Sequence, residues 1–275
     1  MAMQPITLTG GMRANLVSLQ QTNTLMETTQ KRLSTGKKVN SALDDPVAYF
    51  TSMAHEQRAS DLAGRKDQMS ESIQMVKAAN AGIESIRTLI EAAKSLATAA
   101  ASSDVTVDIV SLSDQYNIVR AQIGEMALDS GYKGINLLDN DSTTVKFDED
   151  GTSSLTLQGF DASATVGLAI TASTWNGIGS TIKDAIDDDI ALLDAAVSTL
   201  RKESSKMSNN LSIITARQEF TQGMINTLKD GAAGLTNADM NEEGANMLML
   251  QTRQALGTTS LSLASQAAQS VLRLF

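Results

Sequence analysis

The chain has 275 residues, of which 42% are apolar but only 3% are aromatic, so burial must rely on Ala, Leu, Ile, Val and Met. This composition favours slender helical packing over a wide globular core. The formal net charge of −9 argues against a nucleic-acid-binding protein, because neutralising phosphates requires clustered Lys and Arg, and the lack of cysteine excludes disulfides, thiolate metal sites and cysteine nucleophiles.

The first segment predicts a helix with an apolar seam. Four apolar residues follow at strict seven-residue steps, namely Met12, Leu19, Met26 and Leu33. Such a repeat places them along one side of a supercoiled helix. Gly36 can adopt the left-handed conformation that closes a helix. After a connector of about ten residues, Asp45 and Pro46 are expected to cap and start the next helix.

The second segment repeats this pattern over a longer stretch. Its seam consists of Leu62, Met69, Val76, Ile83 and Ile90, with Ala97 continuing the series. The repeat predicts a helix of about 50 residues, or about 75 Å. Alternating steps of four and three residues predict a third, shorter amphipathic helix through Leu112, Tyr116, Val119, Ile123 and Met126.

The middle of the chain, from Gly131 to about Ser180, is rich in Gly, Ser, Thr and Asp. Two short alternating runs, 145–147 and 155–157, flank an acidic stretch that ends in Asp150 and Gly151. This arrangement predicts a β-hairpin with its turn near those two residues. The acidic triplet at 187–189 is expected to be a solvated turn near a helix start.

A second long helix is predicted to pair with the first. Its seven-residue ladder is Ile186, Leu193, Leu200, Met207, Ile214, Thr221 and Leu228. Gly231 and Gly234 are expected to end it, and the stretch from Thr236 to Asp239 to restart a helix through a capping box. The last segment carries Met249, Leu256 and Leu263 at seven-residue steps, with Val271 on a neighbouring row.

These elements together predict a mainly α fold: a long antiparallel coiled-coil helical bundle with a small β-hairpin region, whose termini pair as helices. The two ends are poor in charge, since residues 1–26 contain only Arg13 and residues 244–275 only Arg253 and Arg273. Exposed helices are normally better solvated. Either the ends simply form an intramolecular coiled coil, or they are mobile in the monomer and fold when buried among neighbouring copies.

Two separated motifs resemble one known family. The stretch from Arg32 to Ala48, RLSTGKKVNSALDDPVA, closely resembles the amino-terminal signature of bacterial flagellins. Residues 235–247, LTNADMNEEGANM, and the closing segments 254–258 and 266–275 resemble motifs at the carboxyl end of the same family. The resemblance covers nearly the whole chain except about 139–180.

The resemblance implies a structural subunit, not an enzyme, that self-polymerises into the bacterial flagellar filament for swimming motility. It implies a location in the extracellular filament, reached through the flagellum's own channel without a cleaved signal, and no cofactor. The implied partners are further copies of the chain, a flagellar export chaperone at the carboxyl-terminal region, and filament cap and hook-associated proteins. Nucleic-acid binding and membrane insertion are not expected.

The resemblance also suggests how the chain is divided. We expect an N-terminal filament-core helix and connector (1–44), N-terminal rod helices (45–130), a short outer variable hairpin region (131–180), a C-terminal rod helix (181–234) and a C-terminal core helix (235–275).

The sequence departs from the family pattern in the segment that an innate-immune receptor binds in many flagellins. Here Glu91 matches, but Thr88 and Ile90 stand where that segment has arginines, so weak or no receptor activation is expected.

Other readings remain open at this level. The hook-filament junction protein is a structural relative with similar helical ends, and a cytoplasmic coiled-coil scaffold would also show heptads. An enzyme is the remotest reading, because His55 is the only histidine and no convergent catalytic or metal-binding set is evident.

Overall fold

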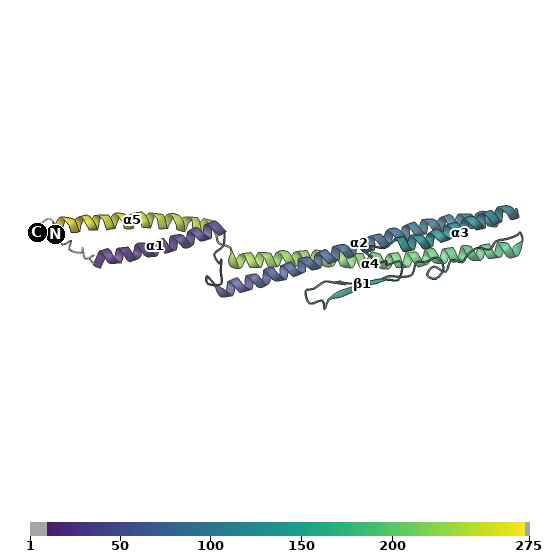
Figure 1. The fold of residues 1–275 in the computed structure, drawn as a ribbon, viewed down its shortest axis with the longest axis horizontal. Coiled ribbons are helices and arrows are strands. Elements are labelled where there is room, and N and C mark those ends of the chain that lie inside the picture. The colour runs from purple at the N-terminus through teal and green to yellow at the C-terminus, as the bar shows by residue number, and fades with distance from the viewer. Residues whose placement is uncertain (1–9, 273–275) are drawn as a thin grey trace. The chain divides into compact units, whose positions relative to one another are not determined.

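The computed structural model describes residues 10–272. Over this range the chain forms five helices and one hairpin, drawn in chain order in Figure 1. The elements are α1 (Gly10–Thr35), α2 (Pro46–Ser102), α3 (Thr106–Asp129), β1 (Ser142–Lys146), β2 (Ser154–Gln158), α4 (Ser180–Thr236) and α5 (Met240–Leu272). The predicted mainly α fold class is confirmed, including the antiparallel long helices and the contact between the terminal helices.

The chain folds as two compact units. One unit combines the residues up to Gln57 with those from Thr227 onward, and therefore contains α1, α5 and one end each of α2 and α4. The other unit, Arg58–Asn226, contains the rest of α2 and α4 together with α3 and the hairpin. Each unit is described below by itself.

Helix boundaries follow local capping chemistry. Gly36 has φ +69°, the left-handed conformation that ends α1, and its N–H donates to the Arg32 carbonyl at 2.8 Å. The Asp45 carboxylate accepts the N–H of Ala48 at 3.0 Å, and Pro46 is the first residue of α2. These boundaries are the predicted ones.

The predicted boundary between α4 and α5 is wrong in two details. Helix α4 runs through Gly231 and Gly234 to Thr236, whose hydroxyl donates to the Ala232 carbonyl at 2.9 Å. Glycine weakens a helix interior by only about 1 kcal/mol, which flanking helical residues offset. The cap of α5 is Asp239 alone, which accepts the N–H of Asn241 at 2.8 Å.

The core of the Arg58–Asn226 unit is built from α2, α3 and α4. Polar bonds across α2 and α4 show that they are antiparallel: Lys66 Nζ donates to Gln222 Oε1 at 2.9 Å, and Ser204 Oγ to Asn80 Oδ1 at 3.2 Å. Strands β1 and β2 form an antiparallel hairpin in which Val145 pairs with Leu155, and Gly151 takes φ +71° in its turn. The irregular segment 159–179 contributes buried apolar side chains to this core, namely Ala162, Ala164, Leu168, Ile170 and Trp175.

Candidate functional site

The α1–α2 connector is tied to the turn between α4 and α5. The N–H groups of Lys38 and Val39 both donate to the Thr236 carbonyl, at 2.7 and 3.2 Å, and Ala238 N–H donates to the Gly36 carbonyl at 2.9 Å. Because these bonds use backbone groups far apart in sequence, they fix where α1 ends relative to where α5 begins.

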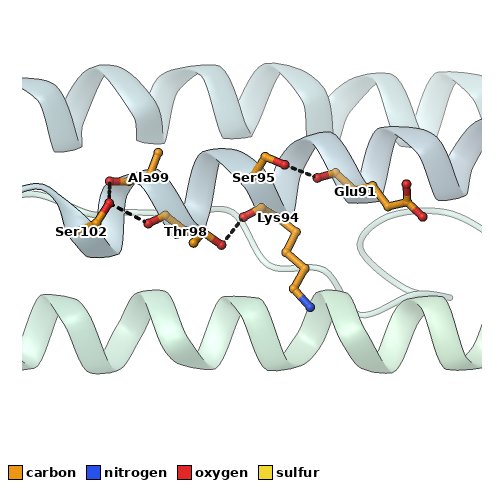
Figure 2. A pocket seen from close by; sticks show the side chains of 6 residues that line it. All are labelled: Glu91, Lys94, Ser95, Thr98, Ala99 and Ser102. Atoms are coloured by element: carbon orange, nitrogen blue, oxygen red, sulfur yellow. Dashed lines mark hydrogen bonds between the residues drawn. The ribbon is translucent and has the colours of Figure 1, made fainter.

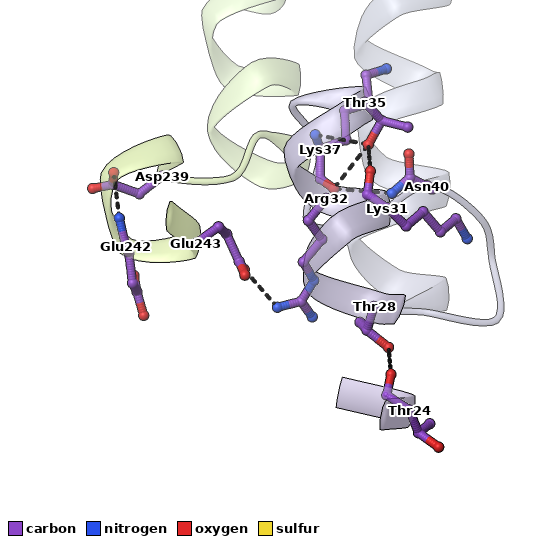
Figure 3. A network of polar contacts seen from close by, with 10 residues as sticks. All are labelled: Thr24, Thr28, Lys31, Arg32, Thr35, Lys37, Asn40, Asp239, Glu242 and Glu243. Carbon is purple, nitrogen blue, oxygen red and sulfur yellow. Dashed lines mark hydrogen bonds and ion pairs between the residues drawn. The ribbon is translucent and has the colours of Figure 1, made fainter. Parts of the chain in front are cut away.

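An ion pair reinforces this junction. Figure 3 shows Glu243 of α5 pointing toward Arg32 of α1, and Arg32 Nη1 lies 2.8 Å from Glu243 Oε1. The Glu243 side chain is buried, whereas that of Arg32 is about one third exposed. Among the described residues, Arg32 Nε and Glu243 Oε2 are buried without a hydrogen-bond partner. Removing either side chain would leave the charge of the other one partly buried and without its partner.

Asp44 stabilises the α1–α2 connector through hydrogen bonds to residues earlier in the same loop. Its carboxylate accepts the N–H groups of Asn40 and Ser41, each at 3.0 Å, and the Ser41 hydroxyl at 3.1 Å. The hydrogen bond from the Asn40 backbone is the largest cause that lowers the pKa of Asp44 from 3.8. The charged form of Asp44 therefore organises the loop that precedes α2.

The inner seam between α1 and α5 is narrow and partly polar. In α1 the predicted row of Met12, Leu19, Met26 and Leu33 is half-buried. Alternating with it in α1 are Thr22 and Thr29, both buried. Across the seam, Asn15 Nδ2 donates to Ser260 Oγ at 3.1 Å and Gln254 Nε2 to Asn23 Oδ1 at 3.0 Å, which makes the pair antiparallel.

On α5, the residues that meet α1 are not those of the seven-residue row. Leu250 is buried, and a Cβ atom on Gly257 would lie 2.5 Å from Leu19 Cδ2, so Leu19 fills a notch at that glycine. The predicted residues Met249, Leu256 and Leu263 are exposed instead. The seam lies one residue further along than the seven-residue row, which places that row about 100° around the helix from the contact with α1. The side chain of Val271 lies outside the described residues.

Large apolar side chains consequently face outward on both terminal helices. On α5 they are Leu248, Met249, Leu256 and Leu263, and on α1 they are Leu16, Val17 and Leu25. A helix pair with one apolar seam inside and a second apolar surface outside is suited to pack against further helices.

The seams predicted for the long helices are buried throughout. On α2 these residues are Leu62, Met69, Val76, Ile83 and Ile90, and on α4 they are Ile186, Leu193, Leu200, Met207, Ile214 and Leu228. Thr221, which interrupts the apolar ladder, is also buried.

A buried polar cluster surrounds Asp189, and the seven-residue repeats do not predict it. Asp189, expected in a solvated turn, is 8% exposed and accepts Trp175 Nε1 at 2.8 Å and the Thr171 hydroxyl at 2.7 Å. Tyr116 lies against Trp175 with ring centroids 4.9 Å apart, and burial, followed by the Asp189 charge, raises the pKa of Tyr116. Seven-residue spacing could not reveal this cluster, because its partners come from the irregular segment 159–179.

The segment that resembles the receptor-binding stretch of flagellins lies on α2. Thr88 and Glu91 are exposed, whereas Ile90 is fully buried. Glu91 also borders a shallow groove along the end of α2, shown in Figure 2. The hydroxyls that line this groove donate to carbonyls of the same helix, as Ser95 does to Glu91 at 2.9 Å and Thr98 to Lys94 at 2.8 Å. The groove is therefore an ordinary helix surface without convergent chemistry.

Residues 10–272 lack metal-binding clusters and membrane-spanning helices. No cluster of His, Asp and Glu suited to hold a metal ion occurs there. No helix in that range is long and apolar enough to cross a bilayer.

The chain was compared with known proteins. Residues 11–143 match the family model of the bacterial flagellin N-terminal helical region, and residues 184–275 match that of the C-terminal helical region. The chain is 26% identical to flagellin FljM and 28% identical to flagellin FljK of Caulobacter vibrioides, over 100% of both proteins in each case. It is 26% identical to a flagellin of Brucella melitensis, over 94% of this chain and 95% of that one. A crystal structure of Bacillus cereus flagellin matches 56% of this chain and 88% of that chain, with 18% identity and a TM-score of 0.47.

Helical ends that pair through a narrow seam and leave apolar rows outside define a self-assembling structural subunit. The chain belongs to the bacterial flagellin family. It is a non-enzymatic protein that polymerises into the extracellular flagellar filament.

Proposed function

We propose that the outward apolar rows of α1 and α5 are the surfaces that this flagellin buries against other copies in the filament core. The single observation that carries the proposal is the exposure of Leu248, Leu256 and Leu263, at 67%, 67% and 62%, on a helix with very few charges. Burying each such side chain contributes about 1.5–3 kcal/mol. Residues 1–44 and 235–275 would then form the filament core, 45–130 and 181–234 the surrounding rod, and 131–180 the outer surface.

The small apolar core of the unit that contains both ends supports folding of the ends on assembly. Among the described residues, the unit that contains both ends buries only four apolar side chains, namely Val39, Leu228, Ala232 and Leu250. Ordering each residue costs about 1–2 kcal/mol of backbone entropy, so this small core offsets little of the cost for about 70 terminal residues. We infer that the filament supplies the missing burial.

Seeded elongation tests the assembly surface. Replacing Leu256 and Leu263 together by Asn should raise the monomer concentration needed for growth on filament fragments by at least about tenfold. Val166→Asn, at an exposed apolar residue outside the terminal helices, is the matched control and should grow normally. Normal growth of the double variant would contradict the proposal.

The carboxyl-terminal row also supports a proposal about export. Before assembly, an exposed apolar surface on α5 needs a cover in the cytoplasm, and an export chaperone at residues 235–275 would provide it. A chain ended at residue 234 should then lose chaperone binding in a titration with the purified chaperone. Undiminished binding would show that the chaperone contacts another part of the chain. The proposed contacts with filament cap and hook-associated proteins rest on the family resemblance alone.

We further propose weak or no activation of the innate receptor that reads flagellins. Burial of Ile90 and the short side chain of Thr88 support this, because neither offers a guanidinium to a partner. Purified monomer should give little signal in a receptor-reporter assay, and a potent response would reject the proposal.

A further inference from the structure

We propose that the outward face of α3 in one copy binds the outward face of α4 in a neighbouring copy, with the two helices parallel. Asp114 would lie opposite Lys206, and Glu125 opposite Arg217. The inference rests on the polymerisation of the chain and concerns surfaces of the Arg58–Asn226 unit, distinct from the terminal helices.

The outward face of α3 is acidic. Its inward face is buried through Ile109, Tyr116 and Ile123. The outward residues, all exposed, are Val107, Asp114, Ile118, Glu125 and Asp129. Residues eleven apart on a helix lie in line after three turns, so Val107, Ile118 and Asp129 form one line. Asp114 and Glu125 form a second line beside it. Within the part of the chain that the structure describes, these acids have no ion pair.

The outward face of α4 is basic. Its inward face is buried through Leu200, Met207 and Ile214. The outward residues, all exposed, are Lys202, Lys206, Ile213, Arg217 and Phe220. Lys206 forms an ion pair with Glu203 at 3.3 Å, in which the lysine is about half exposed and the glutamate side chain is mostly buried. The Arg217 guanidinium lies over the ring of Phe147 of the same chain, 5.2 Å from its centroid, and Arg217 stays exposed to solvent. Ile118 on α3 and Phe220 on α4, at 64% and 61% exposure, place apolar area beside these charges.

The two faces carry charges of opposite sign at the same spacing. Asp114 and Glu125 are eleven residues apart on α3, and Lys206 and Arg217 are eleven residues apart on α4. Each pair therefore spans about 16 Å along its helix. Charges of opposite sign at equal spacing can pair simultaneously only in one register, which gives the contact its specificity.

The parallel orientation follows from the unit itself. Both α3 and α4 run antiparallel to α2, since Ser130 at the end of α3 lies against Gly82, and Asn80 bonds to Ser204. Copies that share one polarity along a filament must therefore present α3 and α4 in parallel.

The contact must also be staggered. In one chain Ser130 at the end of α3 lies against Gly82 of α2, and Ser204 of α4 lies against Asn80 of α2. Asp114 is therefore about 30 Å from the level of Lys206 along the helices. The charges meet only if the neighbouring copy is displaced by that amount. A contact between two different faces with such a displacement repeats from copy to copy without closing, as an open polymer requires.

Cross-linking tests the pairing directly. The natural chain has no cysteine, so Asp114→Cys with Lys206→Cys introduces the only two thiols. After growth of the full chain on filament fragments, a short bismaleimide should link many copies into a ladder on a denaturing gel. The monomer should give no ladder. Asp114→Cys with Lys77→Cys, on an exposed residue of α2, is the control and should give none in the filament.

Charge exchange provides the second arm. Asp114→Lys or Lys206→Glu alone should raise the monomer concentration needed for growth at low salt by at least about threefold, and the double exchange should restore growth. Asp67→Lys and Lys77→Glu on α2 should change little. If every variant grows normally and no ladder forms, the proposed α3–α4 contact is wrong. The proposed function would still stand, because these variants leave the surfaces of α1 and α5 unchanged. Failure of the wild-type chain to grow on fragments would instead overturn the proposed function.

Discussion

At the scale of single residues, the terminal helix pair depends on one notch. Leu19 occupies the space beside Gly257, where an added Cβ would lie 2.5 Å from Leu19 Cδ2. A larger residue must push α1 away from α5 or move the leucine. The absence of a side chain at this position thus positions the seam.

We therefore expect Gly257→Leu to raise the monomer concentration needed for seeded growth, and Leu19→Ala in the same chain to restore part of the growth by returning the lost volume. Gly244→Leu on the same helix is the control, since nothing lies within 4 Å of a Cβ there. Equal growth of the Gly257 and Gly244 variants would show that the notch is dispensable.

Asp44 provides a pH-dependent contact at the same scale. The Asn40 backbone hydrogen bond lowers the pKa of Asp44 in the folded chain. Ionised Asp44 therefore stabilises the connector fully above its unfolded pKa of 3.8, and this stabilisation is lost as the pH falls through the lowered folded pKa. Hydrogen exchange of the Asn40 and Ser41 amides should therefore become faster than the intrinsic pH trend below pH 3.8. Asp44→Asn should show fast exchange at neutral pH and no such transition, whereas unchanged protection would exclude the Asp44 cap.

At the scale of elements, α1 and α5 are joined at one end by polar contacts and along their length by a thin apolar seam. The Arg32–Glu243 pair and the backbone bonds to Thr236 hold the ends of the two helices in register. Breaking a fully buried ion pair costs about 3–5 kcal/mol, and the exposure of Arg32 reduces that figure.

Glu243→Ala should therefore destabilise the α1–α5 pair, while Glu242→Ala, at the exposed neighbouring acid, should not. The helical content of assembled and monomeric protein by circular dichroism, together with seeded growth, measures the difference. If both variants behave like the wild type, the ion pair does not set the register.

At the scale of the whole molecule, burial is divided unequally between the two units. Nearly all buried apolar side chains of the described residues belong to Arg58–Asn226. Local opening requires least free energy where few apolar contacts are lost, so the unit that holds both ends should open first.

Limited proteolysis of the monomer should consequently remove both ends and leave a resistant fragment close to Arg58–Asn226. The same treatment of filaments should spare the ends, because neighbouring copies bury them. Ends that resist the protease in the monomer would show that the pair is stable alone and that assembly does not drive its folding.

Local sequence patterns are sufficient to predict the helices, the hairpin and the family. Seven-residue repeats mark α1, α2 and α4, Gly36 and Asp45 mark two helix boundaries, and the acidic stretch before Gly151 marks the turn. These features arise from local backbone preferences and from periodicity, which a sequence displays directly.

Which helix faces meet depends instead on contacts between segments that are far apart in the chain. Periodicity groups Met249, Leu256 and Leu263 on one side of α5, yet Leu250 and Gly257 face α1 because the notch accepts Leu19. Likewise, the burial of Asp189 depends on residues of an irregular segment that approach it in space. A repeat specifies that residues share a side of a helix, whereas the partner of that side is chosen by shape and polar contacts between distant segments.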